Sequence, residues 1–257
     1  MTVQDGRDRR LGSVVRVFDI VEHLRAVECD GVTNIAESVG AAKSTVHAHL
    51  ATLESKGYVV REGEEYRLGI RFLTLGEHVR AAEPLAQAAR RPVEDLAEET
   101  GEHVVAMTIQ HGLGTVVHVG EGDRSVPSDI TVGTPVYLHC SAGGKAVLAT
   151  YPRDRVDGVV DRWGLPAFTD ATITDRESLH EELADVRESG VATNREEYLD
   201  GVVALGTAVH APDGTVEGAI TLSGPARRLF GCGREADLRD SLLASANAIE
   251  VNLMFHS

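Results

Sequence analysis

Two short runs of small and polar residues have the types and spacing to bind a charged partner. Lys-Ser-Thr-Val-His at 43–47 follows a Gly-Ala-Ala turn at 40–42. A cation, two hydroxyls and an imidazole at the start of a helix can contact phosphates and base edges. Ser-Ala-Gly-Gly at 141–144 opens an apolar segment. Its free backbone N–H groups suit a carboxylate or phosphate, and its small side chains allow close approach to the backbone.

Each run also has an ordinary structural explanation. Ser44 and Thr45 could simply be first-turn helix residues, with Lys43 as a solvated charge. Gly143 and Gly144 could serve close packing of a helix on a sheet. The residues alone leave both explanations open for the second run. For the first run, the order of the surrounding elements favours nucleic acid.

Catalytic and metal-binding motifs are absent from the sequence. The run SAGGK resembles a phosphate loop, but His139 stands where a Gly is required and Ala146 where a Ser or Thr is required. The histidines and cysteine that could gather a metal have spacings that fit no known motif: His103, His111, His118, His139 and Cys140. Cys140 has no Cys/His/Asn order around it. We therefore predict no catalytic residue, metal or cofactor, with a metal-dependent sensor or enzyme as the alternative.

The elements around the first run form a recognisable order. We expect a helix capped by Ser13 and running to about Val27, with an apolar face of Val14, Val17, Phe18, Val21 and Leu24. A short helix at 34–39 and a third helix at 43–57 follow, the third burying Val46, Leu50 and Leu53. Residues 58–69 read as a hairpin turning at Glu62-Gly63.

Three helices and a hairpin make a winged helix-turn-helix, a mainly α fold that binds DNA. Its third helix enters the major groove with Lys43, Ser44, Thr45 and His47, while the wing, with Arg61 and Arg67, lies on the phosphate backbone. The charge distribution agrees. Residues 1–80 carry 11 Lys and Arg against 12 Asp and Glu, whereas the whole chain carries 25 against 40. The acidic, lysine-poor remainder suits a high-salt cytoplasm, while a GC-rich genome would also favour Arg over Lys. The near-neutral first 80 residues are what we expect if only this part approaches a polyanion.

The rest of the chain reads as an α+β domain behind an apolar helix. Residues 70–79 form that helix, which we expect to be a dimer seam, and Pro84 begins a second helix ending at Thr100-Gly101. Short β-branched runs then predict strands, later joined by a Pro-Asp-Gly turn, at 103–109, 114–121, 128–134, 201–211 and 214–224. Helices are expected at 141–151, 175–188 and 234–254. The sheet should be mostly antiparallel.

Several of these strings resemble one known family. SVVRVFDIVEHL and GVTNIAESVGAAKSTVHAHLATLESKGYVVREGEEYRLG resemble the DNA-binding domain of IclR transcription regulators. VGTPVYLHCSAGGKAVLA, the segment from TITDRESL to HAPDG, and AITLSGPARRL resemble the IclR effector domain, a GAF-like fold that binds small molecules. The resemblance implies dimerisation through the DNA-binding domain and the following helix. It also places the effector at matching positions: Ser125, Ser128, Ala142, Gly143, Asn194, Val202, Ala204, Thr221 and Ser223.

These observations predict a ligand-responsive regulator. Its domains would be a DNA-binding domain at 1–69, a linker helix at 70–83 and an effector domain at 84–257. It would act in the cytoplasm, away from membranes, as a homodimer or homotetramer on an operator in double-stranded DNA. The hydroxyl and amide groups among the effector positions favour a small, polar, anionic metabolite, for which Arg124 and Arg195 could supply a counter-charge.

Overall fold

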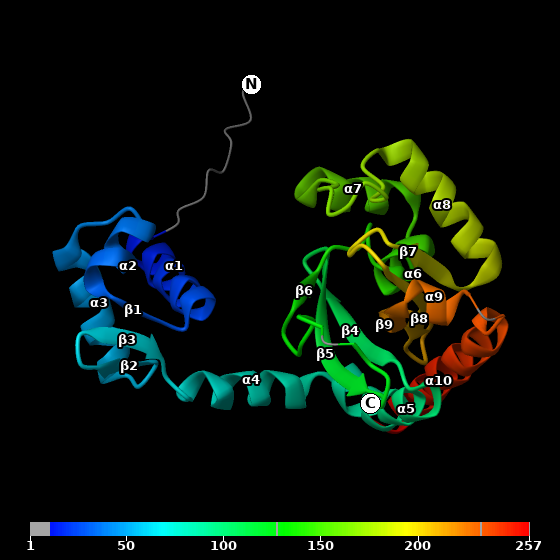
Figure 1. Ribbon diagram of the computed structural model, residues 1–257, viewed down its shortest axis with the longest axis horizontal. Coiled ribbons are helices and arrows are strands. Elements are labelled where there is room, and N and C mark those ends of the chain that lie inside the picture. The colour runs from blue at the N-terminus through cyan, green and yellow to red at the C-terminus, as the bar shows by residue number, and fades with distance from the viewer. Residues whose placement is uncertain (1–10, 127, 232, 257) are drawn as a thin grey trace. The chain divides into compact units, whose positions relative to one another are not determined.

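The chain divides into two units, residues 1–79 and 80–257 (Figure 1). The computed structural model describes residues 11–126, 128–231 and 233–256. Residues 1–10 of the predicted DNA-binding domain, and Cys232, lie outside the described residues. None of the helices in the described part of the chain is both long and apolar enough to cross a bilayer.

The first unit is the predicted winged helix-turn-helix. Its hairpin β2–β3 turns through Gly63-Glu64, one residue later than expected, because Glu62 still pairs with Glu65. The strand order is β1-β3-β2, with both pairings antiparallel. The three-residue strand β1 was not predicted. The elements are α1 (Gly12–Val27), β1 (Cys29–Gly31), α2 (Val32–Ser38), α3 (Lys43–Ser55), β2 (Val59–Glu62) and β3 (Glu65–Leu68).

Apolar side chains of the three helices meet in one core. The predicted α3 positions Val46, Leu50 and Leu53 are all buried. On α1 the prediction was partly wrong. Leu24 is buried, but Val14 and Phe18 are 48% and 62% exposed, because α1 reaches the rest of the core through its second half. Further core residues are Ile20, Ile35, Ala36, Val59 and Tyr66.

The start of α1 also differs from the prediction. The helix begins at Gly12 with Leu11 at the cap position, and no side chain caps it. Ser13 therefore lies inside the first turn instead of preceding it, and its hydroxyl is not the predicted cap.

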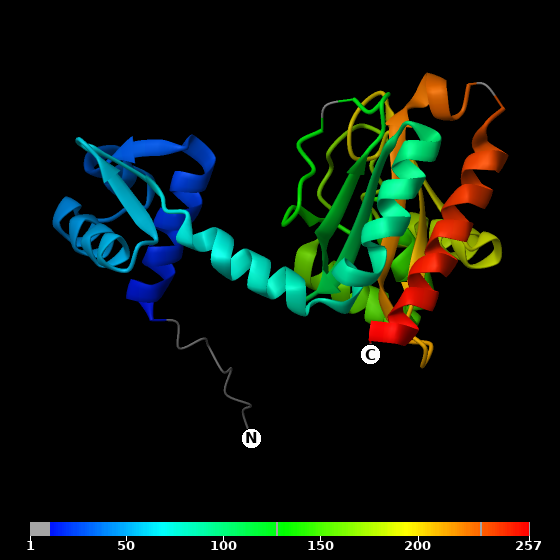
Figure 2. The same ribbon diagram turned by 90° about the horizontal axis from the view of Figure 1, so that it is seen from below.

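The second unit is a six-stranded antiparallel sheet between two layers of helices, which confirms the predicted α+β class. The strand order is β6-β5-β4-β9-β8-β7. Helices α5 and α10 cover one face, while α6 and α8 lie on the other (Figure 2). The unit contains α5 (Pro84–Thr100), β4 (His103–Gln110), β5 (Leu113–Glu121), β6 (Pro135–Val136), α6 (Ala142–Thr150), α7 (Arg153–Trp163), α8 (Arg176–Ser189), β7 (Ala192–Arg195), β8 (Val202–His210), β9 (Val216–Pro225), α9 (Ala226–Leu229) and α10 (Glu235–His256), and is preceded by α4 (Arg71–Ala82).

One predicted strand of this unit is wrong. The described residues 128–134 form a loop, followed only by the two-residue strand β6. Gly133 has a φ of +89°, outside the β region, so the run cannot continue as a strand into β6 despite its β-branched residues. The short edge strand β7 and the one-turn helix α9 were not predicted. The loop matters because it forms part of the site described next.

Candidate nucleic-acid interface and ligand cavity

The first turns of α3 present a polar surface opposite the buried core face. Lys43, Ser44 and His47 are exposed and Thr45 is half-buried. The turn after α2 brings the chain into α3, whose first bonds run from the Thr45 and Val46 amides to the Ala42 carbonyl. Within the described residues, none of these four side chains makes a hydrogen bond. They are therefore available to a partner, and their contact with DNA stays a prediction.

The two arginines of the wing are exposed but already paired. Arg67 Nε donates to Glu62 Oε1 at 2.6 Å. Arg61 Nε donates to the Gly63 carbonyl at 2.9 Å, and its Nη2 lies 3.6 Å from Glu64 Oε1. A phosphate would have to replace these contacts, so the wing is a weaker anion surface than its two arginines alone indicate.

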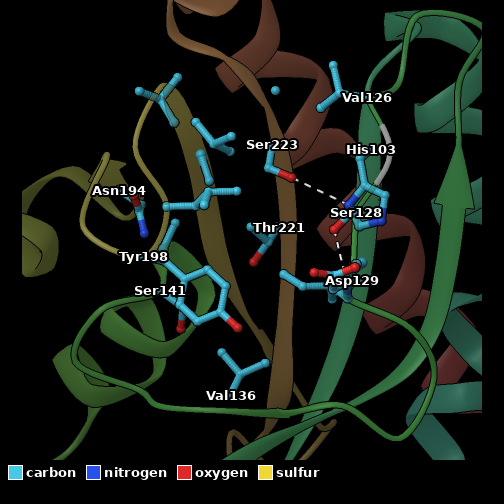
Figure 3. A pocket seen from close by; sticks show the side chains of 18 of the residues that line it. His103, Val126, Ser128, Asp129, Val136, Ser141, Asn194, Tyr198, Thr221 and Ser223 are labelled. Atoms are coloured by element: carbon cyan, nitrogen blue, oxygen red, sulfur yellow. Dashed lines mark hydrogen bonds between the residues drawn. The ribbon is translucent and has the colours of Figure 1, made fainter. Parts of the chain in front are cut away.

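The second unit contains a cavity of about 370 Å³. Its floor is the face of β4, β8 and β9, and its other walls come from the start of α6 and from three loops (Figure 3). Seven of the nine predicted effector positions line it: Ser128, Ala142, Asn194, Val202, Ala204, Thr221 and Ser223. Residues from three distant parts of the sequence thus meet in one site.

The other two predicted positions, Ser125 and Gly143, do not line the cavity. A β-carbon at Gly143 would lie 2.4 Å from Thr221 Oγ1 and 3.0 Å from the Ala219 Cβ. Gly143 therefore serves the close packing of α6 on the sheet, one of the two explanations that the sequence left open. The Ser125 hydroxyl is buried and has no partner among the described residues.

The remaining walls were missed by sequence reasoning and are mainly apolar. They include the aliphatic residues Val105, Met107, Val136 and Leu199 and the aromatic residue Phe168. Tyr198 and His103 add polar atoms. The alternation along β4 could have placed His103 and Val105 on one face. Nothing in the sequence of the loops at 164–175 and 196–201 marks Phe168 or Tyr198.

Polar groups gather at two separate places in the cavity. At one, His103 Nδ1 lies 3.4 Å from Ser223 Oγ, with Ser128 and Asp129 nearby (Figure 3). Ser141 and Ala142, at the start of α6, mark the other. Ser141 Oγ accepts from the Gly144 amide and donates to the Tyr137 carbonyl.

The charges of the cavity are few. Burial is the main cause that lowers the pKa of His103, so the ring is neutral at pH 7. Burial, with Cys140 and Asp129 as further causes, raises the pKa of Tyr198. Among the described lining residues Asp129 is the charged one, and no Lys or Arg is present. Arg124 donates to the Thr100 carbonyl and Arg195 lies over the Phe230 ring, so neither supplies the counter-charge considered from the sequence.

Metal ligands and nucleophiles are not assembled in the described part of the chain. No three His, Cys, Asp or Glu side chains there are placed to hold one ion. Burial raises the pKa of Cys140 to about 12, so its thiol stays protonated. A thiolate is the form that attacks a substrate, so burial makes Cys140 a poor nucleophile.

Family comparisons cover nearly the whole chain. The model of the "IclR helix-turn-helix domain" matches residues 13–63. The model of the "Bacterial transcriptional regulator IclR C-terminal" matches residues 78–251. The two matches fall on the two structural units in turn.

Individual relatives are similar to the chain over nearly their whole lengths. The chain is 28% identical over 255 residues to the "Probable HTH-type transcriptional regulator ArcR" of Halobacterium salinarum, covering 97% of this chain and 96% of the relative. IclR of Thermotoga maritima superposes with a TM-score of 0.78 at 26% identity, covering 95% and 99% of the two chains. An IclR homologue from Microbacterium hydrocarbonoxydans, complexed with 4-hydroxybenzoate, gives a TM-score of 0.80 at 21% identity over 95% and 99%.

Proposed function

The chain belongs to the IclR family of transcriptional regulators and is not an enzyme, and from this premise we propose that a small organic acid in the second unit controls its affinity for operator DNA. The cavity on the β4–β9–β8 face is the observation that carries the proposal. A ligand that binds one conformation of the regulator better than another shifts the population, and with it DNA affinity. The proposed place of action is the cytoplasm.

The proposed DNA contact is made by α3 in the major groove. Lys43 would bind a phosphate or a guanine edge, and Ser44, Thr45 and His47 would reach neighbouring groups. The wing would lie along the backbone with Arg61 and Arg67. Because contacts to the phosphate backbone carry no sequence information, the sequence discrimination is assigned to α3.

The cavity favours a ligand with two polar ends and an apolar middle. A carboxylate would lie at the start of α6, where the helix dipole favours an anion, although the Gly144 amide is already bonded to Ser141 Oγ. A hydroxyl at the far end would donate to Asp129 or bond Ser223. The apolar walls between them, Val105, Met107 and Phe168, favour an apolar middle in the small, polar, anionic metabolite that the sequence predicts. The 4-hydroxybenzoate bound to the structural relative has this chemistry.

The proposed regulator is a dimer or a dimer of dimers. Helix α4 buries no residue within the chain, and Leu73, Leu75 and Val79 are 60%, 48% and 68% exposed. These side chains, and separately Phe18 of α1, are exposed apolar groups that a dimer would cover. Pairing here would give two α3 helices for two half-sites of an operator.

Thermal unfolding against a panel of acids tests the ligand proposal. The panel pairs hydroxy acids with matched diacids: 4-hydroxybenzoate with terephthalate, 5-hydroxypentanoate with glutarate, and gluconate with glucarate. We expect a hydroxy acid to raise the melting temperature more than its diacid, because a second carboxylate would face Asp129. Stabilisation by the diacids alone would contradict the proposed orientation.

A further inference from the structure

Lys145 of α6 is the largest fully buried charged side chain among the described residues, with 1% of its surface exposed. Its Nζ lies 2.7 Å from Glu182 Oε1 of α8 and 2.7 Å from Glu197 Oε1. A buried ammonium needs such partners, and removing them is costly. Neither Lys145 nor Glu197 lines the cavity, so the mechanism proposed above leaves this group unused.

Glu197 connects this buried charge to the surrounding chain through its backbone. Its amide donates to Asn194 Oδ1 at 3.1 Å, and its carbonyl accepts from Thr172 Oγ1 at 2.6 Å. Asn194 Nδ2 in turn donates to the Cys140 carbonyl just before α6. The position of Glu197 thus fixes the orientation of the Asn194 amide and the path of the loop at 164–175.

These bonds hold the side of the cavity that the sheet does not support. We define the outer wall as Phe168, Asn194, Tyr198 and Leu199, all of which line the cavity. Three of them lie on the loops at 164–175 and 196–201, and Asn194 lies on the edge strand β7. Thr169 Oγ1 adds one more bond between the two loops, to the Glu196 carbonyl. Loops without a ladder of backbone bonds depend on such contacts for their order.

We propose that Lys145 is a positioning residue of the effector site. Through Glu197 it fixes the outer wall, and so sets ligand affinity without touching the ligand. Glu182 on α8 has a different role. Its carboxylate neutralises the Lys145 ammonium, but it has no bond to the outer wall. The statement about affinity rests on the proposed function, whereas the statement about wall order does not.

Hydrogen–deuterium exchange on the full-length protein tests the wall directly. In Lys145→Met we expect amides in 164–175 and 196–201 to exchange about tenfold faster than in the wild type, with β4 and β9 within about twofold. The matched control Glu182→Gln, which also removes one carboxylate from Lys145, should leave both loops within about twofold. If Lys145→Met does not fold, the same measurement on Glu197→Gln decides. Faster exchange confined to 164–175 and 196–201 supports the proposal. Uniform acceleration across 80–257, no acceleration, or equal acceleration in Glu182→Gln overturns the proposal.

Calorimetry with 4-hydroxybenzoate and 5-hydroxypentanoate adds the ligand readout. For an acid that binds the wild type, we expect the dissociation constant to rise about tenfold in Lys145→Met and to change less than about twofold in Glu182→Gln. Equal affinity of Lys145→Met and wild type overturns the positioning role. If neither acid binds the wild type while the local exchange pattern holds, these acids fail as effectors and the role of Lys145 in wall order stands.

Discussion

Gly143 and Thr221 touch so closely that a β-carbon on the glycine would lie 2.4 Å from the threonine hydroxyl oxygen. The Ala219 Cβ and Met107 Cε would stand at 3.0 Å from the same position. Helix α6 thus rests on β9 through its backbone. We expect Gly143→Ala to destabilise the second unit by about 1–3 kcal/mol, because the packed sheet cannot give way without strain. Urea denaturation measures the change.

The matched control for this substitution is Gly158→Ala. Gly158 lies in the helix α7, and a β-carbon there would meet nothing within 4 Å. Alanine should therefore stabilise the protein by about 0.5–1 kcal/mol through helix propensity. A Gly143→Ala variant as stable as Gly158→Ala would show that the contact with β9 is not tight.

The exposed start of α3 carries the second prediction. Lys43→Ala and Thr45→Ala should each weaken specific operator binding by about 1–3 kcal/mol, since each removes a contact to DNA. Lys56→Ala, at the other end of the same helix, is the control with the same loss of charge. Fluorescence anisotropy with an operator fragment gives the affinities. If Lys56→Ala weakened binding as much as Lys43→Ala, operator binding would depend on the total positive charge and not on a contact of Lys43 in the groove.

Acid should destabilise the second unit. Burial is the largest cause that lowers the pKa of His103, His118 and His139 below the ordinary 6.5. Below that pH the unfolded chain binds protons that the folded chain does not, so stability falls as the pH drops through 6.5. Glu217 acts in the opposite sense, because burial raises its pKa.

The only tryptophan, Trp163, lies in the second unit and reports its unfolding. We expect a lower urea midpoint at pH 5.5 than at pH 7.5, and a smaller difference in His118→Gln. Equal midpoints in the wild type would show that the buried histidines do not govern acid stability.

Substitution in α4 tests the dimer seam. Leu73→Asp should raise the dimer dissociation constant by about tenfold or more, because it places a carboxylate in an apolar interface. Val132→Asp is the control, an apolar residue of similar exposure (49%) in a loop of the second unit. Sedimentation equilibrium measures both. A monomeric wild type, or an unchanged Leu73→Asp dimer, contradicts the seam.

Amphipathic helices could be predicted from the sequence because buried apolar residues recur along them at the helical period. Val46, Leu50 and Leu53 follow the helical period, and all three are buried. The same rule failed at Phe18, since an apolar stripe can cover a partner as well as a core. Nothing in the period distinguishes the two outcomes.

The cavity could be predicted only in part. The cavity floor and the start of α6 lie on strands and a helix that the sequence predicts. The family resemblance placed Thr221 and Ser223 in the effector site, and both line the cavity. Phe168, Tyr198 and Leu199 lie on loops whose paths depend on long-range contacts, including the Lys145–Glu197 pair. Gly143 failed as a cavity residue because a glycine at a helix start serves packing and ligand approach equally well until its neighbours are known.

Operator affinity measured with and without ligand tests the central claim most directly. Operator fragments would come from footprinting the DNA upstream of this gene and its neighbours. We expect the hydroxy acid that most stabilises the protein to change operator affinity by about tenfold. Ser223→Ala, which removes the cavity hydroxyl proposed to bond the ligand, should reduce this response and leave ligand-free affinity unchanged. An operator affinity that no acid in the panel alters, or a full response in Ser223→Ala, would contradict control from the cavity.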